Sequence, residues 1–140
     1  MDTKISGGCL CGAVRYECDE PPIVGAYCYC SDCRKSSGGA MATLIAVPRD
    51  AFRLTKGELR YFESVADRGS GTERGFCVNC GSPIHVKNGT RATVGIAVGS
   101  LDDPNLFSPG VCLYVASAPS WAHIPANLPR FLANWEDPLA

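Results

Sequence analysis

The sequence predicts an all-β domain whose turns carry metal ligands, and three observations support this prediction. Short runs that alternate apolar and polar residues recur along the 140 residues, with the period of half-buried strands. Fifteen glycines and ten prolines punctuate these runs, which argues against long helices. Seven of the nine cysteines fall into three closely spaced groups: Cys9 and Cys11, then Cys28, Cys30 and Cys33, then Cys77 and Cys80.

The expected strands follow one another with short turns between them. They comprise residues 13–18, 23–28, 41–47, 52–55, 58–62, 84–86, 92–98 and 111–115. The runs 23–28 and 41–47 are more continuously apolar than the others, as is expected of central strands. A short helix or turn is expected near residues 128–135, and residues 64–72 (SVADRGSGT) are expected to form a mobile surface loop.

Length and charge narrow the class of protein. We expect one domain spanning residues 1–140, which is a common size for a single hydrophobic core. The 13 basic and 14 acidic residues are mixed along the chain, so no basic stripe is available for a nucleic acid. The N-terminal residues lack the apolar stretch of a signal peptide, and the longest apolar run, residues 41–47, is too short to cross a membrane. We therefore expect a cytoplasmic protein with neither a membrane nor a nucleic-acid partner.

The cysteine spacing favours metal binding over disulfides. Thiols stay reduced in the cytoplasm, the number of cysteines is odd, and half-cystines one residue apart cannot pair without strain. A secreted disulfide scaffold would also be shorter and would carry a leader. Two cysteines one or two residues apart instead form a chelate for one cation, and zinc accepts four such sulfurs in a tetrahedron.

The first and third cysteine groups together predict a closed structural site. Cys77-x-x-Cys80-Gly81 is typical of a zinc knuckle, because glycine after the second ligand adopts a positive φ and lets backbone N–H groups approach the sulfurs. Its expected partner is the Cys9-x-Cys11 pair, which would staple the N-terminal segment to the middle of the chain. The other interpretations of a lone CxxC are buried thiols or a redox couple, but the helix start of a redox couple is not visible here.

The second group, Cys28, Cys30 and Cys33, is called the cysteine trio below. Three protein ligands and one vacant position are typical of a catalytic zinc, which can activate a thiol, a carbonyl or water. The alternative is a second structural site with a fourth ligand from elsewhere in the chain. The available donors are Cys18, Cys112, His85 and His123. Neither histidine has a motif around it, so the sequence assigns neither a catalytic role.

Several ordered motifs resemble one known family, the glutathione-dependent formaldehyde-activating (GFA, centromere protein V-like) family. They are GCLCGAVRY (8–16), CYCSDCR (28–34), SG (37–38), VP (47–48), FRLTKG (52–57), RGFCVNCG (74–81), GSLDDP (99–104) and LPRF (128–131). The resemblance covers about residues 7–131. It implies an Mss4-like β-tent fold, a structural zinc at Cys9, Cys11, Cys77 and Cys80, and a catalytic-type zinc at the trio.

The resemblance also implies a carbon–sulfur lyase or S-hydroxymethyl-thiol synthase that joins a small aldehyde to a thiol such as glutathione, or cleaves the adduct. Two departures from the family pattern leave the substrates open. Tyr29 and Cys112 stand where many members carry histidine. Cys112 is then either a weak fourth ligand or a reactive thiol.

Two other functions compete with the lyase. One is a non-enzymatic zinc-binding β-tent module that binds a protein partner, and the extra cysteine trio favours the enzyme over it. The other is a methionine sulfoxide reductase-like redox enzyme, but Cys112 lacks the Arg-aromatic-Cys-x-Asn setting of such a nucleophile. The sequence does not indicate the oligomeric state.

Four further residues have two interpretations each. Arg34 and Lys35, next to the last trio cysteine, either attract an anionic thiol or form a solvated surface pair. Trp121 and Phe131 either wall a substrate pocket or belong to the core.

Overall fold

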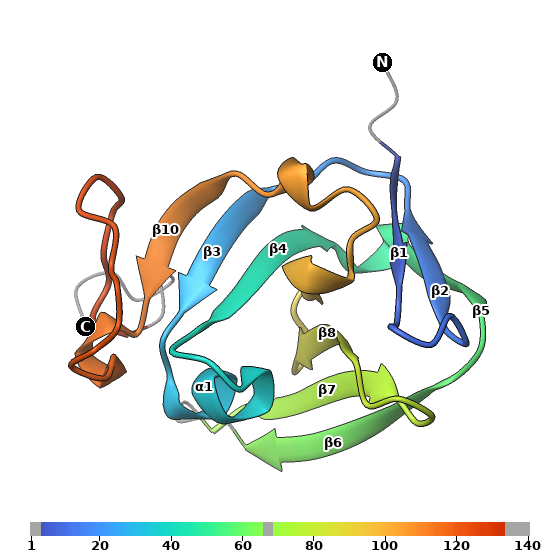
Figure 1. The fold of residues 1–140 in the computed structure, drawn as a ribbon, viewed down its shortest axis with the longest axis horizontal. Helices are drawn as coiled ribbons and strands as arrows, with labels where there is room; N and C mark the ends of the chain where they lie inside the picture. The colour runs from blue at the N-terminus through green and yellow to red at the C-terminus, as the bar shows by residue number, and fades with distance from the viewer. Residues whose placement is uncertain (1–3, 66–68, 134–140) are drawn as a thin grey trace.

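The computed structural model describes residues 4–65 and 69–133, and β-strands dominate it (Figure 1). The strands are β1 (Ile5–Gly8), β2 (Arg15–Cys18), β3 (Val24–Cys28), β4 (Ala42–Pro48), β5 (Phe52–Lys56), β6 (Leu59–Val65), β7 (Gly71–Cys77), β8 (Pro83–Asn88), β9 (Thr93–Ala97) and β10 (Pro109–Leu113). The helices of this part are α1 (Ser31–Ser37) and the 3-10 helices η1 (Arg49–Ala51), η2 (Val98–Ser100), η3 (Pro104–Leu106) and η4 (Val115–Ser117). The predicted β-rich, tent-like class with little helix is confirmed.

Two sheets enclose the core. The smaller sheet has the order β1-β2-β5, and the larger has the order β10-β3-β4-β9-β8-β7-β6. Strand β10 runs parallel to β3, and the other pairs are antiparallel. Strands β3 and β4 have neighbours on both sides, as their continuous apolar runs predict. The core joins residues of both sheets, including Ile5 and Tyr16 of the smaller and Ile45 and Ile96 of the larger.

Tyr16 shows how closely the elements pack. Its ring stacks on Phe52 with centroids 5.2 Å apart, and its hydroxyl lies 2.6 Å from Ser100 Oγ. A Cβ atom at Gly7 would lie 2.3 Å from the Tyr16 hydroxyl oxygen, so only glycine fits there. Desolvation raises the pKa of Tyr16 to about 12.

Besides the four 3-10 helices, the sequence analysis missed two strands, β1 and β7, and the α-helix α1. Strand β1 is short and half glycine, while β7 (GTERGFC) mixes charges and glycines that hide its alternation. The predicted loop at 64–72 is shorter than expected, because β6 continues to Val65 and β7 begins at Gly71. Residues 66–68 of that prediction lie outside the described residues.

The short helix α1 follows the end of β3 (Figure 1). Cys30 caps its N-terminus, since the Cys33 backbone N–H donates to Cys30 Sγ at 3.2 Å. Gly38 ends the helix with a φ of 82° and donates its N–H to the Arg34 carbonyl. Cysteine is not among the usual N-cap residues, so the sequence carried no capping signal.

The segment near residues 128–135, predicted as a short helix or turn, is not helical between residues 128 and 133. Arg130 forms an isolated parallel bridge with Cys112, and bends follow it. Residues 134 and 135 lie outside the described residues. Within 4–65 and 69–133, no helix is long and apolar enough to span a membrane.

Candidate metal centres

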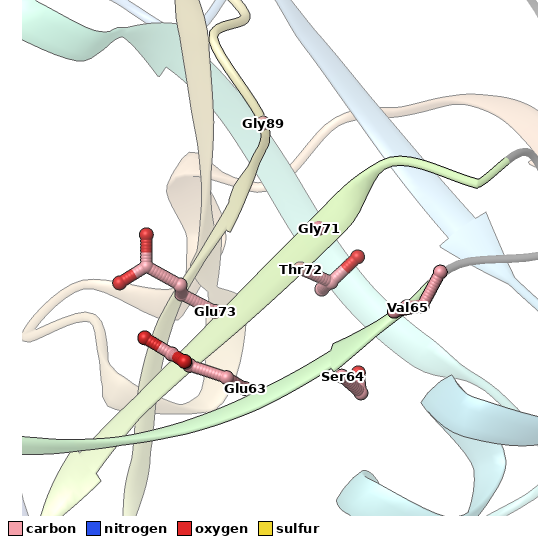
Figure 2. Close-up of a pocket in the computed structure, with 7 residues that line it drawn as sticks. All are labelled: Glu63, Ser64, Val65, Gly71, Thr72, Glu73 and Gly89. Atoms are coloured by element: carbon pink, nitrogen blue, oxygen red, sulfur yellow. The ribbon is translucent and has the colours of Figure 1, made fainter.

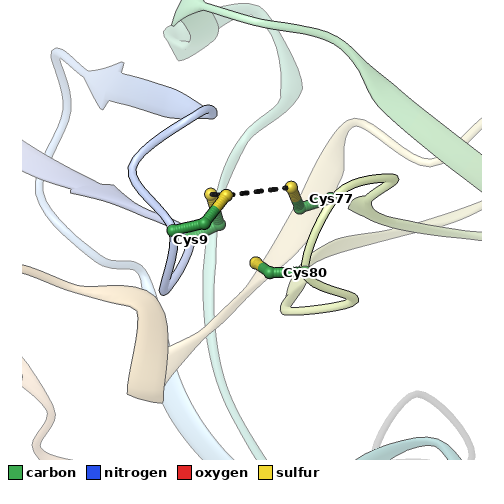
Figure 3. Close-up of side chains that lie close together, drawn as sticks. Cys9, Cys77 and Cys80 are labelled. Carbon is green, nitrogen blue, oxygen red and sulfur yellow. Dashed lines mark hydrogen bonds between the residues drawn. The ribbon is translucent and has the colours of Figure 1, made fainter.

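Two turns from different sheets bring the first four cysteines together, as predicted. Cys9 and Cys11 lie in the turn between β1 and β2, while Cys77 and Cys80 lie at the turn between β7 and β8. We call these residues the four-cysteine site. Their Sγ atoms all lie within 4.8 Å of one another. Figure 3 shows the thiols of Cys9, Cys77 and Cys80 facing one another from the two turns.

The sulfur spacing of the four-cysteine site fits a zinc ion. Sulfurs about 2.3 Å from a tetrahedral zinc stand about 3.8 Å apart. The Cys9–Cys11 sulfur distance is 3.5 Å, and the Cys11–Cys77 distance is 3.8 Å. All nine cysteines are free in the structure, which agrees with metal binding rather than disulfides.

Two polar residues of the β7–β8 turn support the sulfurs. Asn79 donates its backbone N–H to Cys77 Sγ and its side-chain amide to Cys11 Sγ, each at 3.3 Å. The Ser82 hydroxyl lies 3.2 Å from Cys80 Sγ. The side-chain and backbone hydrogen bonds of Ser82 lower the pKa of Cys80 to about 5. Negative charge on the Cys80 sulfur is therefore stabilised by the turn itself.

Glycine conformations shape both turns of the four-cysteine site. Gly81 has a φ of 79° and donates its N–H to the Cys77 carbonyl at 2.7 Å. Gly12 has a φ of 82°, which folds the chain so that the Val14 N–H reaches Cys9 Sγ at 3.2 Å. The positive φ expected of Gly81 is confirmed, and Gly12 adopts the same conformation.

The cysteine trio is assembled within one strand-to-helix connection. Cys28 ends β3, Cys30 caps α1, and Cys33 lies in the first turn of that helix. The three Sγ atoms lie within 4.8 Å of one another. Cys28 and Cys33 are buried, and Cys30 is half-buried. No other Cys, His, Asp or Glu among the described residues joins this group.

The trio stabilises one negative charge without a cation. Hydrogen bonds from Cys28 and Cys33 lower the pKa of Cys30 to about 2, and the nearby charge of Arg74 adds to this. The same contacts with Cys30 and Cys33, together with burial, raise the pKa of Cys28. Because three clustered thiolates repel one another, a cation is needed to deprotonate all three.

Comparisons with known proteins identify the family of this chain. The family model described as glutathione-dependent formaldehyde-activating enzyme (GFA) matches residues 4–117. The chain belongs to the GFA family. A Halomonas elongata protein whose name places it in the same family is 31% identical over 126 residues, which cover 86% of this chain and 80% of the relative. A Rhodobacter sphaeroides crystal structure shares the fold with a TM-score of 0.56 at 24% identity, covering 69% of this chain and 87% of that chain.

The four donors considered as a fourth ligand lie apart from the trio group. Cys18 is fully buried and directs its thiol to the Glu20 carbonyl at 3.4 Å. His85 stacks on Phe52 with centroids 4.3 Å apart, and its Nε2 lies 2.9 Å from the Tyr61 hydroxyl. Burial lowers the pKa of His85 to about 4, so this histidine is neutral at pH 7.

The two positions where this chain departs from the GFA pattern are both fully buried. The Tyr29 hydroxyl donates to the His123 carbonyl at 3.0 Å, which ties the trio connection to the C-terminal segment. Desolvation raises the pKa of Cys112. A buried thiol with a raised pKa has the environment of an inert cysteine, not of a nucleophile.

A cavity of about 990 Å³, called the main cavity below, lies between α1 and the four-cysteine site. The lining comes from α1, from strands β4, β6, β7 and β8, and from the two turns that carry the four-cysteine site. It includes Cys9, Ser36, Ser37, Leu44, Phe62, Arg74, Phe76, Ser82 and Val86. The trio cysteines are not part of the lining, to which the helix that carries Cys33 contributes through Ser36 and Ser37.

The predicted pocket residues lie elsewhere. Trp121 is 70% exposed, and neither it nor Phe131 lines the main cavity. Lys35 is exposed, Arg34 is half-buried, and neither contributes to the lining. The sequence analysis missed Arg74 as a functional candidate, although it begins the RGFCVNCG motif three residues before Cys77.

A second hollow of about 400 Å³ lies on the β6–β7 hairpin (Figure 2). Glu63 and Glu73 are register partners there, and their carboxylates lie on one side of the hairpin. Like charges in this position repel. No group of three metal-ligating side chains occurs there among the described residues.

Proposed function

We propose that this GFA-family chain is a zinc-dependent carbon–sulfur lyase of the S-hydroxymethyl-thiol synthase type. Its substrates are a thiol such as glutathione and a small aldehyde such as formaldehyde. The observation that carries the proposal is the cysteine trio, in which three sulfurs converge and no fourth protein ligand of the described residues joins them. The GFA family name supplies the thiol and the aldehyde.

The four-cysteine site is proposed to hold a structural zinc. Four sulfurs complete a tetrahedron and leave no position for a substrate. The site joins the smaller sheet to the larger one through Cys9 and Cys77, which lie in turns of different sheets. A metal bound there stabilises the fold rather than the reaction.

The cysteine trio is proposed to hold the catalytic zinc. Bound at three thiolates, zinc supplies a positive charge that acidifies a thiol and polarises a carbonyl. The chain contributes the positioning: the cap of α1 fixes Cys30 relative to Cys33, and the end of β3 fixes Cys28. Burial of Cys28 and Cys33 limits the access of water to the sulfurs.

The proposed reaction needs no oxidant or reductant. The sulfur of the thiol forms a bond to the carbonyl carbon, and the π electrons of the C=O bond move to oxygen. The proton that leaves the thiol ends on that oxygen, which gives R–S–CH2–OH from formaldehyde. The reverse reaction breaks the same carbon–sulfur bond and returns the proton to sulfur.

Two other functions fit the structure less well. A methionine sulfoxide reductase-like enzyme needs an accessible nucleophilic thiol, and Cys112 is fully buried with a raised pKa. A zinc module that only binds a protein does not require the vacant position of the trio. We place the protein in the cytoplasm, where its free thiols stay reduced.

Exchange spectroscopy by NMR tests the function. Glutathione and formaldehyde are in exchange with S-hydroxymethylglutathione, and the rate of this exchange is expected to be higher with the zinc-loaded protein than without protein. Cys33→Ser should abolish the acceleration, whereas Cys112→Ala, which removes a thiol outside the trio, should retain it. Equal exchange rates with and without the wild-type protein would contradict the lyase and favour the binding module.

A further inference from the structure

The main cavity contains one cation without an acidic partner. Two arginines of the described chain line it, and one of them, Arg15, forms a salt bridge with Asp102. The other, Arg74, has no salt bridge within 4–65 and 69–133. Its guanidinium donates to Ser64 Oγ at 3.3 Å, while its Nε is buried without a hydrogen-bond partner. Burying a hydrogen-bond donor of a charged group without an acceptor costs free energy, and a ligand that supplies the acceptor removes that cost.

The surroundings of Arg74 are apolar. Its register partners on the neighbouring strands are Phe62 and Val86, and both line the same cavity. Leu44 and Phe76 add to this lining. Apolar walls lower the effective dielectric constant and strengthen the attraction between a guanidinium and an anion. The cavity therefore suits a molecule with an apolar stem and one carboxylate.

Arg74 shares the wall of the main cavity with α1. The helix that carries Cys33 forms part of the cavity wall through Ser36 and Ser37. Arg15, the other arginine of the lining, is paired with Asp102. An anion on Arg74 is thus held in the cavity that α1, the helix of the trio, helps to wall.

We propose that Arg74 is the substrate-binding residue that selects a thiol carrying a carboxylate, which it binds from the wall of the main cavity. This proposal rests on the proposed function, because it assigns the thiol of that reaction to an anionic class. A guanidinium binds a carboxylate through two parallel hydrogen bonds, and the free Nε of Arg74 supplies one such donor. Arg34 and Lys35 do not line the cavity and have no part in this selection.

The test compares two thiols of equal size that differ in charge. Cobalt-loaded protein is titrated with 3-mercaptopropionate and, separately, with its neutral amide, 3-mercaptopropionamide, and binding is followed by visible absorption. Arg74→Gln is expected to weaken binding of the carboxylate about 10- to 100-fold, the effect of losing a charge-assisted hydrogen bond. Binding of the amide should change by less than about twofold, and Arg74→Lys should restore part of the carboxylate affinity.

Arg34→Gln is the matched control, since it removes the same charge next to Cys33 without altering the cavity lining. It should leave both affinities unchanged. If the Arg74→Gln protein does not retain cobalt, the titrations are repeated with Arg74→Met, which keeps the aliphatic stem. The proposal would be overturned if the Arg74 variants weakened the binding of both thiols equally. It would also be overturned if Arg34→Gln weakened the binding of the carboxylate as much as Arg74→Gln does. A wild-type spectrum that responds to neither thiol contradicts the proposed function itself, and the selection by Arg74 with it.

Discussion

The two cysteine clusters of this protein use the same ligand atom but are built in opposite ways. The four-cysteine site joins turns of two sheets, and its sulfurs at Cys11 and Cys77 are 66 residues apart in the sequence. The cysteine trio spans a single strand-to-helix connection. A metal that closes a long loop restricts the unfolded chain, whereas a local chelate adds little to the fold. This difference agrees with the roles proposed for the two sites, a cross-link for the four-cysteine site and a reactive centre for the trio.

The largest expected effect is the loss of the fold when the four-cysteine site is broken. Cys80→Ser should prevent stable folding, because a structural zinc contributes about 10 kcal/mol in small zinc domains. Circular dichroism and a thermal melt measure this effect. A variant that melts cooperatively near the wild-type temperature would show that the site is not structural.

A matched substitution in the trio should affect the metal and not the fold. Cys33→Ser removes one of three sulfurs from a local chelate, so the protein should keep its circular dichroism spectrum and lose one zinc per chain. Elemental analysis and the same thermal melt give the two readouts. If Cys33→Ser unfolds the chain as fully as Cys80→Ser, both sites are structural and the comparison fails.

Metal removal should proceed in two steps. The purified protein is expected to hold two zinc ions per chain, one of which leaves under mild chelation because three thiolates bind less firmly than four. Elemental analysis before and after chelation counts the ions, and Cys33→Ser identifies the site that lost its metal. A single zinc in the untreated protein, or the simultaneous loss of both, would contradict the assignment of two sites.

The smallest expected effect is a small loss of stability when a hydroxyl beside the four-cysteine site is removed. Ser82→Ala removes the hydroxyl that contacts Cys80 Sγ and accepts the Leu10 N–H at 3.0 Å. The melting temperature should fall by a few degrees, as expected for one or two lost hydrogen bonds. Thiol binding at the trio should not change, and a change there would show that the two sites are coupled.

The sequence predicted the cysteine clusters better than the elements around them. Cysteines one or two residues apart lie together in any structure, so the trio and each pair of the four-cysteine site follow from local spacing. The meeting of the two pairs across 66 residues was instead predicted from the four sulfurs that a closed zinc site needs. Strand β7 was missed because its charged residues and glycines hide the alternation, and α1 was missed because its N-cap is a cysteine. Arg74 was missed with β7, since only the register with Phe62 and Val86 places it in a cavity.

The trio is proposed to keep a position for a substrate, whereas the four-cysteine site is proposed to keep none. Cobalt substitution tests this difference directly, because the visible spectrum of cobalt follows its coordination number and sulfur ligands. The Cys33→Ser spectrum, which reports the four-cysteine site, is subtracted from that of the wild type. We predict that the difference shows three sulfurs and shifts when glutathione is added, while the Cys33→Ser spectrum stays constant. A difference spectrum that already shows four sulfurs and does not respond to any thiol would contradict the account.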